Sequence, residues 1–214
     1  MSNILNTNGS KTELIGVAGQ MRSGKNVIGE YLCKNLGMNP ASFAKPVKAV
    51  FCDMFSVDLD FVEQWKTHSE PPVGYNKTIR QSLQFIGDGF RQIKPTVWVD
   101  YSLKYGLPNS VYMDCRYINE LQAVKDRGGK NIVVWRPGFE NDDPNGSEAQ
   151  ILPVVKFLSM FKESGRVSEI IGNSGLTMGQ RQSHAIDLID FFIINNGSLE
   201  DLYAKLDKRV IPFL

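Results

Sequence analysis

The 214-residue sequence is poor in the residues that bind transition metals or form disulfides. Its three cysteines, Cys33, Cys52 and Cys115, are far apart, and it has two histidines and no Cys-x-x-Cys pair. Structural zinc sites need four such ligands at close spacing, and disulfide frameworks need paired cysteines. We therefore expect neither, and the cysteine usage favours a reduced, cytoplasmic setting.

Long apolar runs and an excess of charge are missing as well. No stretch approaches the roughly 18 apolar residues that a membrane span needs, and the polar start of the chain argues against a signal peptide. The 24 basic residues nearly balance the 23 acidic ones, so the net charge is +1, whereas nucleic-acid-binding domains usually carry a basic excess. We expect no membrane and no nucleic acid as partners. A small phosphorylated ligand needs only a few local cations and stays compatible with this balance.

What the sequence does contain is an alternation of strand and helix patterns. Short apolar runs predict strands at 14–18, 41–44, 110–113, 131–135 and 190–194. Apolar residues at helical spacing predict helices at 27–36, 46–55, 78–92, 97–105, 119–127, 151–161 and 198–209. This alternation indicates a parallel sheet covered by helices on both faces, which is a three-layer α/β/α fold. We expect a flexible leader over 1–11 and one domain over 12–214.

The first predicted strand runs into Gly19-Gln20-Met21-Arg22-Ser23-Gly24-Lys25, which matches the pattern G-x-x-x-x-G-K. Glycines let the backbone curl so that several N–H groups face one point, and the following helix adds the positive end of its dipole. The lysine can then reach the β- and γ-phosphates of a nucleotide. We therefore predict a phosphate loop, or P-loop, whose binding residues are Gly19, Arg22, Ser23, Gly24, Lys25 and Asn26. An ordinary strand-to-helix turn with a solvated lysine is the alternative.

Two residues are candidates for binding Mg²⁺. Asn26 stands directly after the lysine, where Ser or Thr usually offers a hydroxyl to the metal, so its amide oxygen would have to serve instead. Asp114 ends the strand 110–113 in the manner of a Walker B acid, which holds the metal through a water molecule. Helix capping is the alternative role for Asp114, because aspartate is a favoured cap.

Two arginines also follow predicted strands. Arg116 comes two residues after Asp114, and Arg136 directly follows the strand 131–135. Ligands of such sheets bind at the carboxyl ends of the strands, and guanidinium groups clamp phosphate in a bidentate fork. Both arginines therefore suit phosphate binding, with surface salt bridges as the alternative.

A polar stripe is predicted on the helix 78–92. Arg80 and Gln84 are four residues apart and share a face, and Arg91 lies seven residues further on, close to the same face. Such a stripe could grip a phosphate group of a second substrate. A solvated helix face is the alternative.

Several segments, in this order, resemble the phage-type deoxynucleoside monophosphate kinases. They are GQMRSGKN, FAKPVKAVF, IRQSLQFIGDGFR followed by VWVD, MDCRYINE, WRPG with the loop ending in Glu148, and DFFIINNGSLEDL. Together they touch most of the chain, whereas 151–183 has the character of an insertion without an assigned role. Asp88 departs from the family's pattern, where a small hydroxyl residue is expected in the acceptor pocket.

The resemblance implies a P-loop kinase that transfers the γ-phosphoryl group of ATP to a deoxynucleoside monophosphate (dNMP). Lys25 and the loop amides would hold ATP with Mg²⁺, and helices within about 56–106 would hold the acceptor. The implied acceptor-side residues are Lys66, Arg80, Gln84, Arg91 and Asp114. Lys25, Arg116 and Arg136 would act on the migrating phosphoryl group, with Arg136 arriving on a lid over about 136–150 that excludes water.

Two other functions stay open. One is a different small-molecule P-loop kinase that resembles dephospho-coenzyme A kinase, since only the acceptor side separates the two. The other is a nucleotide-binding interaction protein without catalysis, which Asn26 and the segment 151–183 motivate. The sequence indicates neither a base nor a sugar preference for the acceptor. A homodimer stays open as a partner arrangement. A phage-encoded protein of this kind would work in the host cytoplasm.

Overall fold

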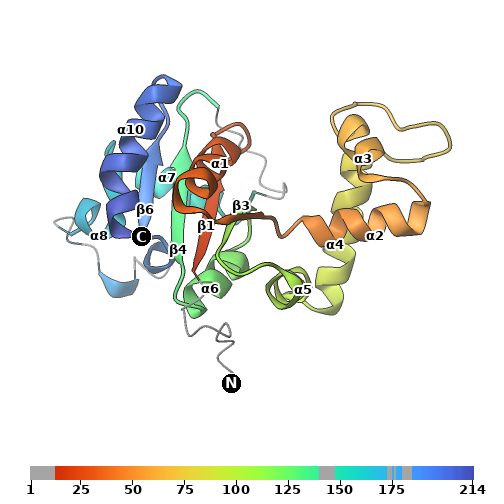
Figure 1. Cartoon of the computed structure of the whole chain (residues 1–214), viewed down its shortest axis with the longest axis horizontal. Helices are drawn as coiled ribbons and strands as arrows, with labels where there is room; N and C mark the ends of the chain where they lie inside the picture. The colour runs from red at the N-terminus through yellow and green to blue at the C-terminus, as the bar shows by residue number, and fades with distance from the viewer. Residues whose placement is uncertain (1–12, 140–147, 173–174, 176, 180–184) are drawn as a thin grey trace. The chain divides into compact units, whose positions relative to one another are not determined.

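The computed structural model describes residues 13–139, 148–172, 175, 177–179 and 185–214 (Figure 1). The expected leader over 1–11 lies outside these residues. The chain forms two compact units, one of Met1–Ala41 with Leu107–Leu214 and one of Ser42–Gly106. We call them the sheet unit and the helical unit.

The sheet unit is built on six strands in the order β2-β3-β1-β4-β6-β5. Their bounds are β1 Leu14–Gly19, β2 Asn39–Ala41, β3 Ser110–Cys115, β4 Lys130–Trp135, β5 Gly165–Arg166 and β6 Phe191–Ile194. Every pairing is parallel except that of β5 with β6 at one edge. The predicted parallel sheet is therefore confirmed, with one short antiparallel strand added.

The second predicted strand, 41–44, was placed too late in the chain. The strand is Asn39–Ala41, and Ser42 then starts a turn: its hydroxyl accepts a bond from the Ala44 N–H, and its carbonyl accepts one from Lys45. Pro40 in the middle of β2 fits its place at the sheet edge, where one side of the strand needs no partner.

Helices cover both faces of the sheet, because its parallel crossovers run in opposite directions. The helix α1 (Lys25–Leu36) leads from β1 towards β2, and α6 (Ile118–Asp126) leads the other way from β3 to β4, so right-handed crossovers put them on opposite faces. The helix α7 (Leu152–Ser159) follows β4 and contacts it, and none of its residues joins the core on the α1 face. The helix α10 (Leu199–Arg209) lies beside α1 (Figure 1), where Tyr31 and Tyr203 stack with ring centroids 4.1 Å apart. These layers confirm the predicted α/β/α fold.

Strand side chains alternate between two cores. One core joins alternate residues of four strands to α1 and α10: Ile15, Val17, Val111, Ile132, Val134, Phe191, Ile193, Ile28, Leu32, Leu202 and Leu206. The helices α6 and α7 bring further buried residues to the sheet. The predicted start of the last helix is confirmed, since Ser198 and Asp201 form a capping box there.

Part of the expected insertion 151–183 belongs to the sheet unit's core. The apolar face of α7 is almost fully buried, with Val155 and Leu158 at 1% and 0% exposure, and the helix contacts β4. After it come β5 and the short helix α8 (Val167–Ile170), for which the sequence offered no clear periodicity. Short 3-10 helices at Ile186–Leu188 and Ile211–Phe213 complete the described part of this unit.

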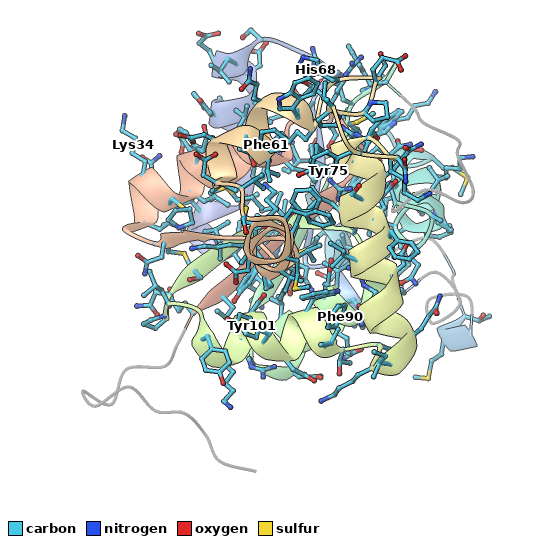
Figure 2. All side chains as sticks on the ribbon, turned by 90° about the vertical axis from the view of Figure 1, so that its right-hand side faces the viewer. Lys34, Phe61, His68, Tyr75, Phe90 and Tyr101 are labelled. Carbon is cyan, nitrogen blue, oxygen red and sulfur yellow. The ribbon has the colours of Figure 1, made fainter. Side chains whose placement is uncertain are left out.

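The helical unit contains four helices among its residues. They are α2 Lys45–Phe55, α3 Leu59–Trp65, α4 Ile79–Ile93 and α5 Val97–Tyr105. An aromatic cluster joins α2 and α3 to the following loop, with the rings of Phe61 and Tyr75 6.1 Å apart (Figure 2). The Trp98 indole N–H donates to the Gly87 carbonyl at 2.9 Å and so joins α5 to α4.

No helix within the described ranges is both long and apolar enough to cross a membrane.

One buried polar side chain ties several elements of the sheet unit together. Asn131 on β4 is fully buried, and its amide nitrogen donates to the carbonyls of Leu121 on α6 and Leu188, each at 2.9 Å. Its amide oxygen points at Gly16, because a Cβ placed on that glycine would come within 2.3 Å of it. This one side chain therefore links β4 to α6 and to the 3-10 helix at Ile186–Leu188.

We expect Asn131→Ala to lower the free energy of unfolding by about 2–4 kcal/mol, since the fully buried side chain and its two hydrogen bonds are lost. Urea denaturation followed by circular dichroism measures the change. Asn35→Ala is the matched control, because Asn35 is exposed and its side chain donates to the Tyr31 carbonyl one turn earlier in α1. Equal losses in the two variants would contradict the role assigned to Asn131.

Candidate functional site

The loop after β1 requires glycine at both of its glycine positions. Gly19 has φ 147°, and a Cβ there would lie 2.3 Å from the Val134 carbonyl oxygen on β4. Gly24 has φ 106° and caps the start of α1, whose residue Ile28 donates to the Gly24 carbonyl at 3.0 Å. Between them, the Ser23 N–H donates to the Gln20 carbonyl at 3.2 Å and closes the turn. The predicted strand–loop–helix context is thus present.

Asn195, which the sequence did not single out, holds this loop from the end of β6. Its side-chain amide donates to the Ser23 carbonyl at 2.9 Å, and its backbone N–H donates to the Trp135 carbonyl at 2.8 Å. A Cβ on Gly24 would come within 2.7 Å of the same amide nitrogen. The one available signal was position, because Asn195 follows the last strand at its carboxyl end.

The ammonium group of Lys25 lies under the loop. Its side chain is 8% exposed, and Nζ donates to the carbonyls of Gly19 and Gln20, each at 2.7 Å. Burial lowers the pKa of Lys25, and the nearby Arg116 guanidinium lowers it further. The carboxylates of Glu148 and Asp114 act in the opposite direction and favour the charged ammonium.

Glu148 brings a carboxylate into contact with the loop. One of its oxygens accepts the Met21 N–H at 2.8 Å, and the other lies 3.7 Å from Lys25 Nζ. The side chain is only 12% exposed. The sequence identified Glu148 merely as the end of the expected lid, so its contact with the loop was missed.

The turn after β3 brings Asp114 and Arg116 to the same end of the sheet. The buried Glu120 carboxylate accepts the N–H groups of Arg116 and Tyr117 at 2.7 and 3.1 Å, and so shapes this turn at the start of α6. Burial raises the pKa of the neighbouring Cys115 thiol well above its usual value. That thiol therefore stays protonated and is no nucleophile.

The remaining predicted residues of the sheet unit lie at its surface. Arg22 is exposed with φ 64°, and Asn26 is exposed on the first turn of α1. Arg136 follows β4 as predicted, but its guanidinium lies 4.3 Å from the centre of the Phe139 ring. The segment 140–147 of the expected lid lies outside the described residues. The structure therefore brings Lys25, Asp114 and Arg116 together, and places Arg136 against an aromatic ring.

The predicted acceptor residues all belong to the helical unit, apart from Asp114. Arg80, Gln84 and Arg91 share one face of α4, and Arg91 pairs with Asp88 at 3.2 Å. Lys66 pairs with Glu63, which also accepts from Lys48 at 2.6 Å. Lys66 is thus engaged within its own unit.

The hydrogen-bond donors of the loop fit a nucleotide phosphate. A metal ion at this site would be coordinated mainly by the nucleotide and by water. No group of three metal-binding side chains occurs within the described ranges. Mg²⁺ in nucleotide sites commonly uses one or two protein ligands together with phosphates and water, which Asp114 and Asn26 could provide. The Ser23 hydroxyl is 1% exposed and has no hydrogen-bond partner among the described residues, so it can serve a phosphate oxygen.

We expect Asn195→Ala to weaken binding of inorganic tripolyphosphate by roughly three- to tenfold, since the loop loses one hydrogen bond that holds its shape. Isothermal titration calorimetry on the full chain measures this. Asn196→Ala is the control, because the side chain of the adjacent Asn196 accepts from Lys205 on α10 instead of bonding to the loop, as far as the structure describes the chain. Unchanged affinity in Asn195→Ala would contradict the role of Asn195.

Comparison with known proteins gives one informative relative. No family model matches the chain. A protein of Acanthamoeba polyphaga mimivirus, named "Putative deoxynucleotide monophosphate kinase", is 28% identical over 212 residues, which cover 90% of this chain and 93% of that protein.

Solved structures with a similar arrangement are more distant. A dephospho-CoA kinase from Campylobacter jejuni is 16% identical with a TM-score of 0.38, over 91% of this chain and 94% of that one. A shikimate kinase from Acinetobacter baumannii is 13% identical with a TM-score of 0.45, over 92% of each chain. Likeness at this level carries no information on the reaction.

Proposed function

We propose that this protein is a kinase that transfers the γ-phosphoryl group of ATP to a deoxynucleoside monophosphate and releases ADP and the diphosphate. The observation that carries the proposal is the glycine-shaped loop with the buried Lys25 ammonium beneath it. A loop of this kind, between a parallel strand and a helix, suits the phosphates of a nucleoside triphosphate.

The choice of acceptor draws on two further observations. The viral relative, similar over nearly the whole of both chains, is named for deoxynucleotide monophosphate kinase activity. The polar stripe on α4 offers Arg80 and Arg91 on one helix face, as a phosphate-bearing acceptor would need. In this proposal Gln84 and Lys66 support the same substrate.

Phosphoryl transfer depends mainly on the positioning of the two substrates and on neutralisation of the phosphate charge. An acceptor phosphate oxygen attacks the γ-phosphorus, and the bond to the β–γ bridging oxygen breaks as ADP leaves. Lys25 and the loop amides hold the β- and γ-phosphates, and Arg116 and Arg136 offset the charge on the migrating group. Bound Mg²⁺ would neutralise phosphate charge, with Asp114 and Asn26 as its protein-side ligands, directly or through water.

A panel of acceptors tests the proposal. The purified chain is incubated with ATP, Mg²⁺ and each dNMP, NMP or dephospho-coenzyme A, and ADP formation is followed. We expect turnover with at least one dNMP. Turnover with dephospho-coenzyme A alone would move the assignment to another small-molecule kinase, and ATP binding without any turnover would indicate a nucleotide-binding interaction protein.

We expect Lys25→Ala to reduce kcat by about a hundredfold or more, because the transferring phosphoryl group loses its fixed positive charge. Steady-state kinetics measures the loss, and circular dichroism checks that the fold is kept. Lys34→Ala is the matched control, since Lys34 is exposed at the other end of the same helix (Figure 2). A Lys25→Ala enzyme as active as the control would rule out the proposed role of the loop.

A further inference from the structure

The Glu148 carboxylate makes the contacts that a nucleotide phosphate needs from the loop. P-loops bind phosphate oxygens through backbone N–H groups and through the lysine ammonium. Here the Met21 N–H donates to one Glu148 oxygen at 2.8 Å, and Lys25 Nζ lies 3.7 Å from the other. A carboxylate and a phosphate are both oxyanions, and both accept charge-assisted bonds from the same donors.

This contact is a buried one. The side chains of Lys25 and Glu148 are 8% and 12% exposed, so water screens their attraction far less than it screens a surface pair. The Glu148 carboxylate also raises the pKa of Lys25 against the effect of burial, and its influence exceeds those of Arg116 and Asp114. An incoming phosphate therefore meets donors that are already engaged.

The backbone around Glu148 is held by bonds that do not involve its side chain. The Glu148 carbonyl accepts the N–H groups of Ile151 and Leu152 at the start of α7. Ile151 is fully buried, and the Gln150 side chain accepts the Ile118 N–H at 3.0 Å. The carboxylate can thus leave the loop by rotation of its own side chain, while α7 stays in place.

We propose that Glu148 is an internal competitor for the phosphate-binding loop, which the β- and γ-phosphates of a nucleotide displace from Met21 and Lys25. The inference rests on the nucleotide-binding part of the proposed function. The apparent dissociation constant of a ligand equals its intrinsic value divided by the fraction of protein in the competent state. By engaging the loop, Glu148 lowers that fraction and weakens the binding of ATP and ADP alike.

The consequence for turnover is easier product release. Release of product often limits the rate of kinases and related enzymes. A carboxylate that returns to Met21 and Lys25 replaces the departing phosphates, so the loop donors regain a partner as ADP leaves. Glu148 thus weakens the hold of the loop on product as well as on substrate.

Removing the competitor should tighten binding, which is the opposite of what loss of a purely structural contact does. We expect the dissociation constant for ADP and for inorganic tripolyphosphate to fall about tenfold in Glu148→Gln. The fall should be larger in Glu148→Ala, because glutamine still offers an oxygen to the Met21 N–H. Isothermal titration calorimetry on the full chain, without Mg²⁺, measures all three proteins.

The matched control is Glu30→Gln, which removes one negative charge from an exposed position on α1. Its affinity should equal that of the wild type. Unchanged or weaker binding in both Glu148 variants would overturn the proposal. Equal tightening in Glu148→Gln and Glu148→Ala would also overturn it, since charge repulsion alone would then account for the effect.

The same measurements separate this inference from the choice of substrate. Tighter tripolyphosphate binding in the variants, in a protein that phosphorylates no dNMP, would support the competitor and reject the kinase assignment. Kinase activity with a dNMP, together with unaltered tripolyphosphate binding in the variants, would support the kinase assignment and reject the competitor. If neither the wild type nor any variant binds ADP or tripolyphosphate, the competitor is rejected together with the nucleotide site.

Discussion

The sheet unit places a positive charge under a curled loop, and the other features of its candidate site are arranged around that charge. Taking an ammonium group out of water costs several kcal/mol unless other groups replace the lost solvation. Two carbonyls of the loop and the Glu148 carboxylate do so for Lys25. The loop can present these carbonyls because Gly19 and Gly24 take conformations that other residues rarely adopt.

Side chains from separate strands and helices then fix the surroundings of this charge. Asn195 at the end of β6 holds the Ser23 carbonyl, and Glu120 in α6 holds the turn that carries Arg116. Gln150, just before α7, accepts the first N–H of α6. The bonds of Asn195 and Gln150 join segments far apart in sequence. The candidate site therefore depends on the parallel sheet, whose strand ends bring those segments together.

Local patterns were enough to predict most of the fold. The helix predicted over 97–105 is observed as Val97–Tyr105, and strands such as Leu14–Gly19 are correct within a residue. The strand predicted at 41–44 was wrong because Ser42 forms a turn. The short helix α3 was missed because its seven residues give too few turns for a clear period.

The candidate site, like the fold, could be predicted from the sequence only in part. The P-loop pattern carries its own geometry, so Gly19, Gly24 and Lys25 could be found from spacing alone. The partners Asn195 and Glu148 could not, since an isolated Asn or Glu after a strand or in a loop has no distinguishing pattern. Their contacts with Ser23 and Met21 span 172 and 127 residues of sequence, and arise only once the sheet has formed.

The close approach of Gly24 to Asn195 has an evolutionary consequence. Any side chain at position 24 would enter the space of the Asn195 amide, whose nitrogen would lie 2.7 Å from the added carbon. Loss of the glycine would therefore displace the Asn195 amide, and the loop would then need another donor for the Ser23 carbonyl. Positions 24 and 195 are thus coupled through this contact, in addition to the positive φ that favours glycine at position 24.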